Sequence, residues 1–177
     1  MNRISVVIWA VFLSLVLICS QAAAAETVET ILHDSDGEKV GTVKLIQEDD
    51  GVIIAVEIQN FEPGFHGFHI HETGLCEPPF TTAGGHYNPE GKDHPHHAGD
   101  LPVLLVNSDG RAYMVFRTDR FKLEDLLEGD GTAFIIHEKP DNFANIPERY
   151  VSEPDRDTLD TGDSGGRLAC GVIAEEQ

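Results

Sequence analysis

From residue 27 onward, hydrophobic and polar positions form short runs rich in Val, Ile, Thr and Phe, and no helical periodicity lasts longer than two turns. Asp36-Gly37, Asp50-Gly51 and Asp109-Gly110 lie between such runs, and pairs of this kind favour tight turns between strands. Eight strands are expected, at Thr27–His33, Lys39–Gln47, Val52–Ile58, Gly67–Glu72, Val103–Val106, Ala112–Arg117, Gly131–His137 and Arg167–Ile173. Short strands with these turns predict an all-β fold, an eight-stranded antiparallel sandwich or barrel.

Three segments depart from this pattern. Phe121–Leu127 has the apolar spacing of a helix of one or two turns. Thr73–Pro102 and Glu138–Gly166 are loops of about 30 residues, a length that usually indicates function or disorder in a compact domain. We expect two long functional loops, the first because it holds most of the histidines, the second as a folded surface loop with several Pro and Asn residues.

Residues 1–25 have the layout of a signal peptide. Arg3 precedes an apolar run, Ile4–Ile18, and four alanines follow and end in a cleavage pattern at Ala25. The run is shorter than the roughly 20 residues that span a bilayer, which disfavours a membrane anchor. Lipid attachment at Cys19 is disfavoured because bulky Ile18 precedes it. We expect residues 26–177 to form one exported domain, periplasmic or extracellular, with no stable membrane span after processing.

Charge and cysteine content narrow the partners and the compartment. The chain has 31 acidic residues against 12 Lys and Arg, a net charge of −19 that becomes −20 when Arg3 leaves with the signal peptide. A chain this acidic is a poor candidate for binding nucleic acid, so we expect no such partner. After cleavage only Cys76 and Cys170 remain, and an even pair in an exported chain predicts a disulfide.

The histidines are clustered, with seven of nine between positions 66 and 97. His69 and His71 are two residues apart on a predicted strand, so both point to the same face and could bind one metal ion. Exposed strands also carry such pairs, so the pair alone is weak evidence. His137, at the end of another predicted strand, is a candidate third ligand distant in sequence.

A second group of metal-ligating residues lies on the first long loop. It comprises His86, His94, His96, His97 and Asp100. Nitrogen and oxygen donors without thiolate suit Zn²⁺ or Cu²⁺, and three His with one Asp form a closed tetrahedral set typical of structural zinc. The alternative is a solvated, acidic, histidine-rich loop without metal.

Five motifs resemble, in order, those of the copper/zinc superoxide dismutases. They are GFHIHE at 67–72, GGHYNP at 84–89, HAGDLP at 97–102, IIHE at 135–138 and GGRLACGVI at 165–173. The resemblance covers essentially all of residues 26–177 and includes both cysteines, which match the family's disulfide. It implies a secreted bacterial member with a Greek-key fold. The implied activity is dismutation of superoxide to oxygen and hydrogen peroxide by a redox-cycling copper with a structural zinc.

The resemblance also implies a role for each site residue. The expected copper ligands are His69, His71, His86 and His137, and the expected zinc ligands are His86, His94, His97 and Asp100. Arg167, which would orient superoxide beside copper, and His86, which would bridge the metals, are the expected catalytic residues. Asp141 is expected to link the outer nitrogens of His69 and His94, fixing their orientation.

Some positions depart from the family pattern. Only Pro95 and His96 separate His94 from His97, so His96 competes with His97 as a zinc ligand, although the HAGD motif favours His97. His33 and His66 are expected to be structural or surface residues. Basic residues that some relatives carry before the final strand are not clearly matched here.

The main alternative function is a non-enzymatic module that buffers or delivers copper or zinc on the same fold, because a fold alone does not determine activity. Such a module needs only the ligands, whereas turnover also needs Arg167, the His86 bridge and an open copper face. A zinc hydrolase is disfavoured because neither His71-Glu72 nor His137-Glu138 continues to H-E-x-x-H. The sequence leaves oligomeric state open, with a homodimer as one option.

Overall fold

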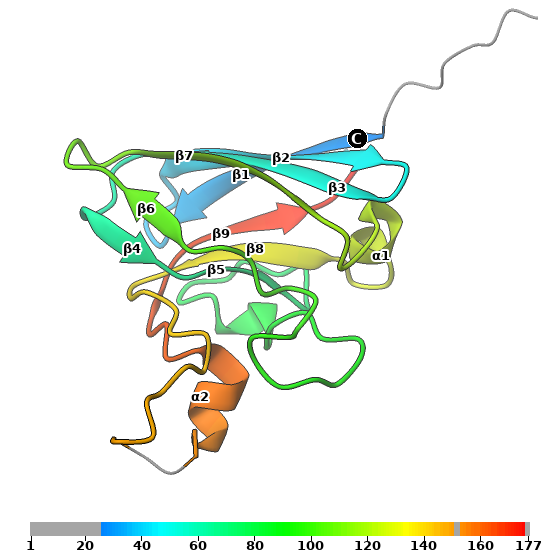
Figure 1. Cartoon of the computed structure of the whole chain (residues 1–177). Coiled ribbons are helices and arrows are strands. Elements are labelled where there is room, and N and C mark those ends of the chain that lie inside the picture. Colours follow the sequence, from blue (N-terminus) through cyan, green and yellow to red (C-terminus); the bar gives the residue numbers. More distant parts are fainter. Residues whose placement is uncertain (1–25, 151–152, 176–177) are drawn as a thin grey trace, which may run out of the picture.

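The computed structural model describes residues 26–150 and 153–175 (Figure 1). Within them the strands are β1 (Thr27–Asp34), β2 (Lys39–Glu48), β3 (Gly51–Ile58), β4 (Gly64–His66), β5 (Phe68–His71), β6 (Leu104–Val106), β7 (Ala112–Thr118), β8 (Thr132–His137) and β9 (Arg167–Ile173). The helical elements are α1 (Leu123–Leu127), α2 (Arg156–Thr161) and the 3₁₀ turn η1 (Thr81–Ala83).

Seven strands form one antiparallel sheet in the order β5-β8-β9-β1-β2-β3-β7, and β4 pairs with β6 in a second, two-stranded sheet. The large sheet curls, so that β5, β8 and β9 face the layer of β1, β2, β3 and β7 (Figure 1). Alternate residues of β1 are buried, because one face of the strand packs on the core between the layers. In that core the rings of Phe68 and Phe134 stack with centroids 5.3 Å apart.

The all-β antiparallel fold expected from the sequence is confirmed, and each of the eight expected strands is present with bounds shifted by at most one residue. Strands distant in sequence are neighbours, as a Greek-key fold requires: β9 pairs with β1, and β7 returns to pair with β3. The expected helix at Phe121–Leu127 forms as α1. The short strand β4 was not expected, because three residues are too few to show a period.

The second long loop is folded, as expected, but it contains a helix that was not expected. The Asp155 side chain caps α2 by accepting a hydrogen bond from the Thr158 backbone N–H at 2.9 Å, and Gly162 ends the helix at φ 59°. Both are ordinary helix boundary residues. Six residues between such caps carry too little apolar periodicity for the pattern to reveal the helix.

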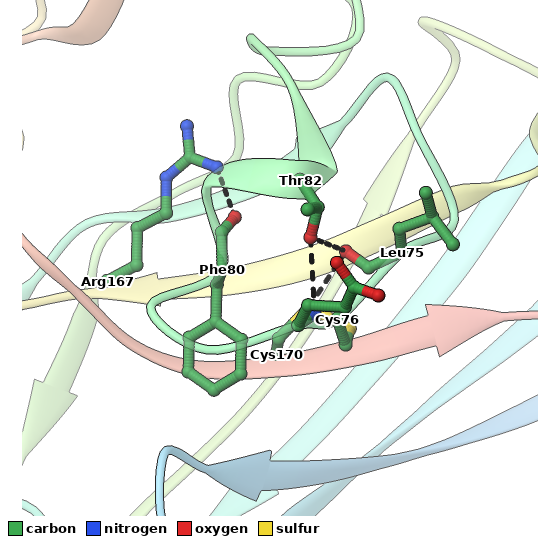
Figure 2. Close-up of a disulfide and its surroundings, with 7 residues drawn as sticks. Leu75, Cys76, Phe80, Thr82, Arg167 and Cys170 are labelled. Carbon is green, nitrogen blue, oxygen red and sulfur yellow. Dashed lines mark hydrogen bonds between the residues drawn. A yellow bond between two sulfur atoms is a disulfide. The ribbon is translucent and has the colours of Figure 1, made fainter.

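A disulfide between Cys76 and Cys170 joins the first long loop to β9, with Cα atoms 5.6 Å apart (Figure 2). The expected pairing is therefore confirmed. Cys170 also belongs to a small buried cluster with Phe80, Ala83 and Ile135. The disulfide and this cluster fix the start of the loop against β8 and β9, which places the rest of the loop at one end of the sheet.

The expected signal peptide at residues 1–25, with Cys19, lies outside the residues that the structure describes. In the part of the chain that it does describe, no helix has the length and apolar character to cross a membrane.

Replacing both cysteines by serine is expected to lower the free energy of unfolding by about 2–5 kcal/mol, because the bridge closes a loop with a sequence separation of 94 in the unfolded chain. Urea titration of the metal-free protein measures this difference. Reduced wild-type protein should unfold at the same urea concentration as the double variant. An unchanged midpoint in both would contradict the expectation.

Candidate metal centre

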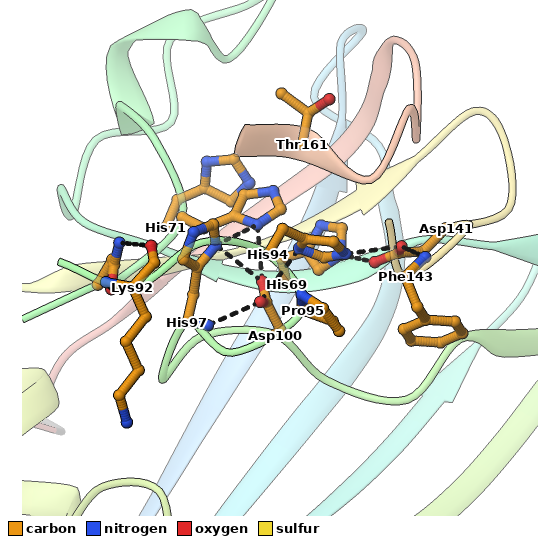
Figure 3. Close-up of polar contacts among 12 residues, drawn as sticks. His69, His71, Lys92, His94, Pro95, His97, Asp100, Asp141, Phe143 and Thr161 are labelled. Carbon is orange, nitrogen blue, oxygen red and sulfur yellow. Dashed lines mark hydrogen bonds and ion pairs between the residues drawn. The ribbon is translucent and has the colours of Figure 1, made fainter. Parts of the chain in front are cut away.

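Two adjacent groups of buried metal-ligating side chains lie where the long loops meet β5 and β8 (Figure 3). The first group is His69, His71, His86 and His137, and the second is His86, His94, His97 and Asp100. In each group, one potential ligand atom from every residue lies within 4.8 Å of the others. Since His86 belongs to both, the two groups share a side chain.

The first group is built on two paired strands. β5 is buried along its length, and its period of two brings His69 and His71 into the same group. β8 ends at His137, where its pairing with β9 shifts register after Ile136, and an irregularity of this kind redirects a side chain. His137 Nε2 lies 3.3 Å from His71 Nε2. Residues 66 positions apart in the chain thus meet.

Hydrogen bonds to the protein commit one nitrogen of each of these rings. His71 Nδ1 donates to the Gly84 carbonyl oxygen at 3.0 Å, and His137 Nδ1 donates to the Gly165 carbonyl oxygen at 3.3 Å. The other nitrogen of each ring keeps its lone pair for a metal. His69 Nδ1 is buried and has no hydrogen-bond partner among the described residues. Buried polar atoms normally have a partner, so this orphaned nitrogen fits a bound metal ion.

The second group surrounds the carboxylate of Asp100. Its Oδ1 accepts from His86 Nδ1 at 2.8 Å and lies 3.2 Å from His97 Nδ1, while its Oδ2 lies 3.1 Å from His94 Nδ1. The His97 backbone N–H donates to Oδ2 at 2.9 Å. Three imidazole nitrogens and one carboxylate therefore converge as a closed set.

Asp141 connects the two groups from outside (Figure 3). Its Oδ2 accepts from His69 Nε2 at 2.7 Å and its Oδ1 from His94 Nε2 at 2.8 Å. The Phe143 backbone N–H also donates to Oδ1, at 2.6 Å. The side chain is fully buried. Asp141 therefore fixes a histidine of β5 relative to a histidine of the loop.

Burial favours neutral imidazoles in the first group. It lowers the pKa of His86 to about 4 and of His137 to about 2, and it lowers the pKa of His69 and His71 as well. The cause is poor solvation of a charged ring in the interior. At pH 7 these rings are neutral, which is the form that binds a metal ion.

The carboxylates have the opposite effect on His94. Burial alone would lower its pKa, but hydrogen bonds to Asp100 and Asp141 outweigh burial and raise the pKa to about 9. Burial likewise opposes ionisation of Asp100, yet the hydrogen bonds from His86, His94 and His97 bring its pKa far below the ordinary value. Asp100 is therefore anionic, and a metal ion that bound to His94 would have to displace a proton from its ring.

Arg167 stands beside the first group in a cleft of about 650 Å³ that His71, His86 and His137 also line. Its Nη1 donates to the Phe80 carbonyl oxygen at 2.5 Å, as Figure 2 shows, and its Nη2 donates to the Gly84 carbonyl oxygen at 2.6 Å. Burial lowers the pKa of Arg167, but arginine stays charged in proteins. The disulfide-bonded loop thus holds a cation at the wall of the cleft.

Acidic side chains form another part of this cleft. Asp157, Asp160 and Asp163, from α2 and the residues after it, line it together with Lys139. Asp160 is paired with Arg156, whose Nε lies 3.1 Å away. The cleft therefore presents both signs of charge to an entering ion.

The remaining histidines have different environments. His96 is exposed and belongs to neither group, whereas His97 is buried in the second group. The geometry therefore favours His97 over His96 as a candidate zinc ligand. His33 is exposed on β1. His66 is buried, and its ring nitrogens contact the carbonyl oxygens of His137 at 2.8 Å and Glu62 at 2.9 Å. It supports the end of β8 that carries His137, a role that its sequence position did not reveal.

Comparison with known proteins decides the family. The chain matches the family model described as copper/zinc superoxide dismutase (SODC) over residues 39–173. The chain belongs to the copper/zinc superoxide dismutases. It is 42% identical over 173 residues to "Superoxide dismutase [Cu-Zn]" of Mycobacterium tuberculosis, which covers 86% of this chain and 72% of that protein. It is 34% identical to the protein of the same name from Escherichia coli K12, covering 98% and 99%.

Solved structures agree with this assignment. A SOD-like protein from Bacillus subtilis has a TM-score of 0.71 at 34% identity and covers 85% of this chain and 99% of that one. The Cu/Zn superoxide dismutase from Brucella abortus has a TM-score of 0.67 at 30% identity, covering 84% and 99%. As a copper/zinc superoxide dismutase, the protein is an enzyme that dismutates superoxide, with copper and zinc as cofactors.

Gly162→Ala is expected to weaken metal retention by the second group about 10-fold or more, because Asp141 orients its His94. A Cβ at Gly162 would overlap Asp141 Oδ1 and lie 2.6 Å from His94 Nε2. Zinc content after dialysis against a chelator measures retention. Gly91→Ala is the matched control, since Gly91 has a similar φ of 62° but no atom within 4 Å of a Cβ. Equal zinc retention in both variants would contradict the expectation.

Proposed function

We propose that the first group holds the catalytic copper and the second the structural zinc. The first group offers imidazole nitrogens and borders the cleft, so an ion there has an open side. The second offers three nitrogens and one carboxylate oxygen, a closed set that suits zinc. The observation that carries this assignment is the shared His86, which has its Nδ1 in the second group and leaves its Nε2 for the first.

Arg167 binds the substrate in this proposal. Copper, when bound, supplies the one-electron redox chemistry that zinc lacks. The guanidinium is held by two carbonyl oxygens of the disulfide-bonded loop, so it is oriented before superoxide arrives. A fixed cation in a half-buried site both positions the anion and stabilises its charge.

His86 is the proposed proton carrier. Its Nδ1 is engaged by Asp100, so a proton is taken up and given back at Nε2, on the side of the first group. Burial lowers the pKa of His86 and so favours the neutral ring, which is the form that has a lone pair to offer at Nε2. The non-enzymatic alternative is not favoured, because a buffer has no use for an oriented arginine beside an open cleft.

We also propose that the protein acts outside the cytoplasm after removal of residues 1–25. The disulfide supports this proposal, because such bonds persist in oxidising compartments, periplasmic or extracellular. The N-terminal residue of the processed protein, read by mass spectrometry, tests the cleavage after Ala25. A homodimer stays a prediction, which sedimentation velocity would measure.

His137→Ala is expected to abolish superoxide removal and to lower copper content, because it removes a ligand of the first group. Arg167→Ala is expected to lower kcat/KM about 10²-fold with copper content unchanged, because a charge-stabilising group is lost without a ligand. Metal analysis and stopped-flow superoxide decay give both values. Arg111→Ala, at an exposed position outside the cleft, is the control. Full activity in His137→Ala would overturn the proposed function.

Asp157→Asn is expected to raise kcat/KM about twofold at low ionic strength, because in water one charge at about 10 Å repels an anion by about 0.4 kcal/mol. The gain should disappear as salt shortens the Debye length. Asp36→Asn removes the same charge from the β1–β2 turn, outside the cleft, and should leave the rate unchanged. An equal gain in the two variants would assign the effect to net charge instead of the cleft wall.

A further inference from the structure

The proposed zinc ligands lie largely on a loop that has no regular structure. His94, His97 and Asp100 fall within seven residues between η1 and β6. Within the loop, the His96 N–H donates to the Asp93 carbonyl oxygen at 2.9 Å and the Asp100 N–H to that of His97 at 3.3 Å. Ligands on a loop need support from outside to keep a metal-binding geometry. Residues outside the loop that hold its backbone in place therefore contribute to the metal-binding geometry.

Arg120 reaches this loop from the end of β7. Its Nη1 donates to the carbonyl oxygens of Asp100 at 2.8 Å, His97 at 3.1 Å and Pro95 at 3.3 Å. A single Nη group has two hydrogens, so three acceptors share them. Two of these carbonyls belong to proposed zinc ligands, and the third follows His94 directly. One cationic nitrogen thus gathers the backbone around three of the four ligands.

The charge of Arg120 is directed at this backbone. Among the described residues, no carboxylate oxygen lies within 4.0 Å of its guanidinium. Arg117, three residues earlier, instead forms ion pairs with the carboxylates of Glu48 and Asp50. The base of Arg120 is fixed, since its N–H donates to Thr118 Oγ1 at 3.3 Å and the next residue, Phe121, is buried.

We propose that Arg120 is a positioning residue that clamps the loop of residues 95–100 so that His94, His97 and Asp100 converge on zinc. This inference rests on the proposed assignment of the second group to zinc. Without the clamp, three carbonyl oxygens lose a common donor and the loop samples other conformations. Zinc binding would then have to order the loop, and the entropy cost of that ordering would reduce the affinity for zinc. Loss of an outer-shell partner of this kind lowers metal affinity about 10- to 100-fold.

The test compares zinc affinity across matched arginine variants, in copper-free protein, by competition with a fluorescent chelator. Arg120→Met removes the donors and keeps an apolar stem, and it should weaken zinc binding about 10- to 100-fold. Arg120→Gln, which loses the charge and the reach, carries the same expectation if Arg120→Met does not fold. Arg120→Lys, with three N–H donors on one nitrogen, should recover most of the affinity. Arg117→Met should bind zinc like the wild type.

Two further readouts separate positioning from a general structural role. The free energy of unfolding of metal-free Arg120→Met should be no lower than that of metal-free Arg117→Met. The visible spectrum of Co²⁺ in the second group should lose intensity in Arg120→Met, because intensity reports tetrahedral geometry. Wild-type affinity in Arg120→Met and Arg120→Gln, or an equal loss in Arg117→Met, would overturn the clamp.

A separate pair of variants tests the assignment on which the clamp depends. His97→Ala should lose zinc binding, whereas His96→Ala, at the exposed neighbouring residue, should keep it. Retention of zinc in His97→Ala would overturn the zinc assignment itself. Loss in His97→Ala together with wild-type affinity in Arg120→Met and Arg120→Gln would leave the assignment standing and remove only the clamp.

Discussion

The rest of the site depends on one constraint: apart from the shared His86, a buried histidine is oriented for a metal ion when one ring nitrogen bonds to the protein and the other stays free. Backbone carbonyls take the outer nitrogens of His71 and His137, and Asp141 takes those of His69 and His94. Without these acceptors each ring could rotate or carry its proton on the wrong nitrogen. The strands set the distances between the histidine rings, and the hydrogen-bond acceptors set the orientation of each ring.

This constraint explains why both long loops fold back onto the same end of the sheet. Gly84 comes from the first loop and Gly165 from the second, and their carbonyl oxygens hold rings from β5 and β8. Gly84 also accepts from Arg167, so one carbonyl orients both a proposed copper ligand and the proposed substrate anchor. The disulfide keeps that part of the loop on β9. The disulfide therefore helps to hold the Gly84 carbonyl oxygen where it orients His71 and Arg167.

The strands and the candidate metal-binding histidines could be predicted from the sequence, because both depend on residue types in recognisable patterns. Alternating apolar residues and Asp-Gly turns predicted eight strands to within one residue. The imidazole clusters identified the residues that the structure gathers into two groups, because few other functions need so many histidines. The helix α2, the role of His66 and the clamp by Arg120 could not be read. The helix α2 is too short to show a period between its local caps. The roles of His66 and Arg120 depend on contacts of one side chain with carbonyl oxygens of distant segments, which residue identity does not reveal. The choice between His96 and His97 as a candidate ligand likewise required the burial of each side chain in the structure, since both are plausibly spaced in the sequence.

The shared ring of His86 has a thermodynamic consequence. In the proposed assignment its two nitrogens serve different groups, so an ion in one group changes the basicity and orientation that the ring offers to the other. Such coupling is reciprocal: the factor by which zinc changes copper affinity equals the factor by which copper changes zinc affinity. In that assignment the affinities of the protein for the two metals depend on one another. The binding free energy of both metals together then differs from the sum of their separate binding free energies by one coupling free energy, to which the His86 ring and the Asp141 link both contribute.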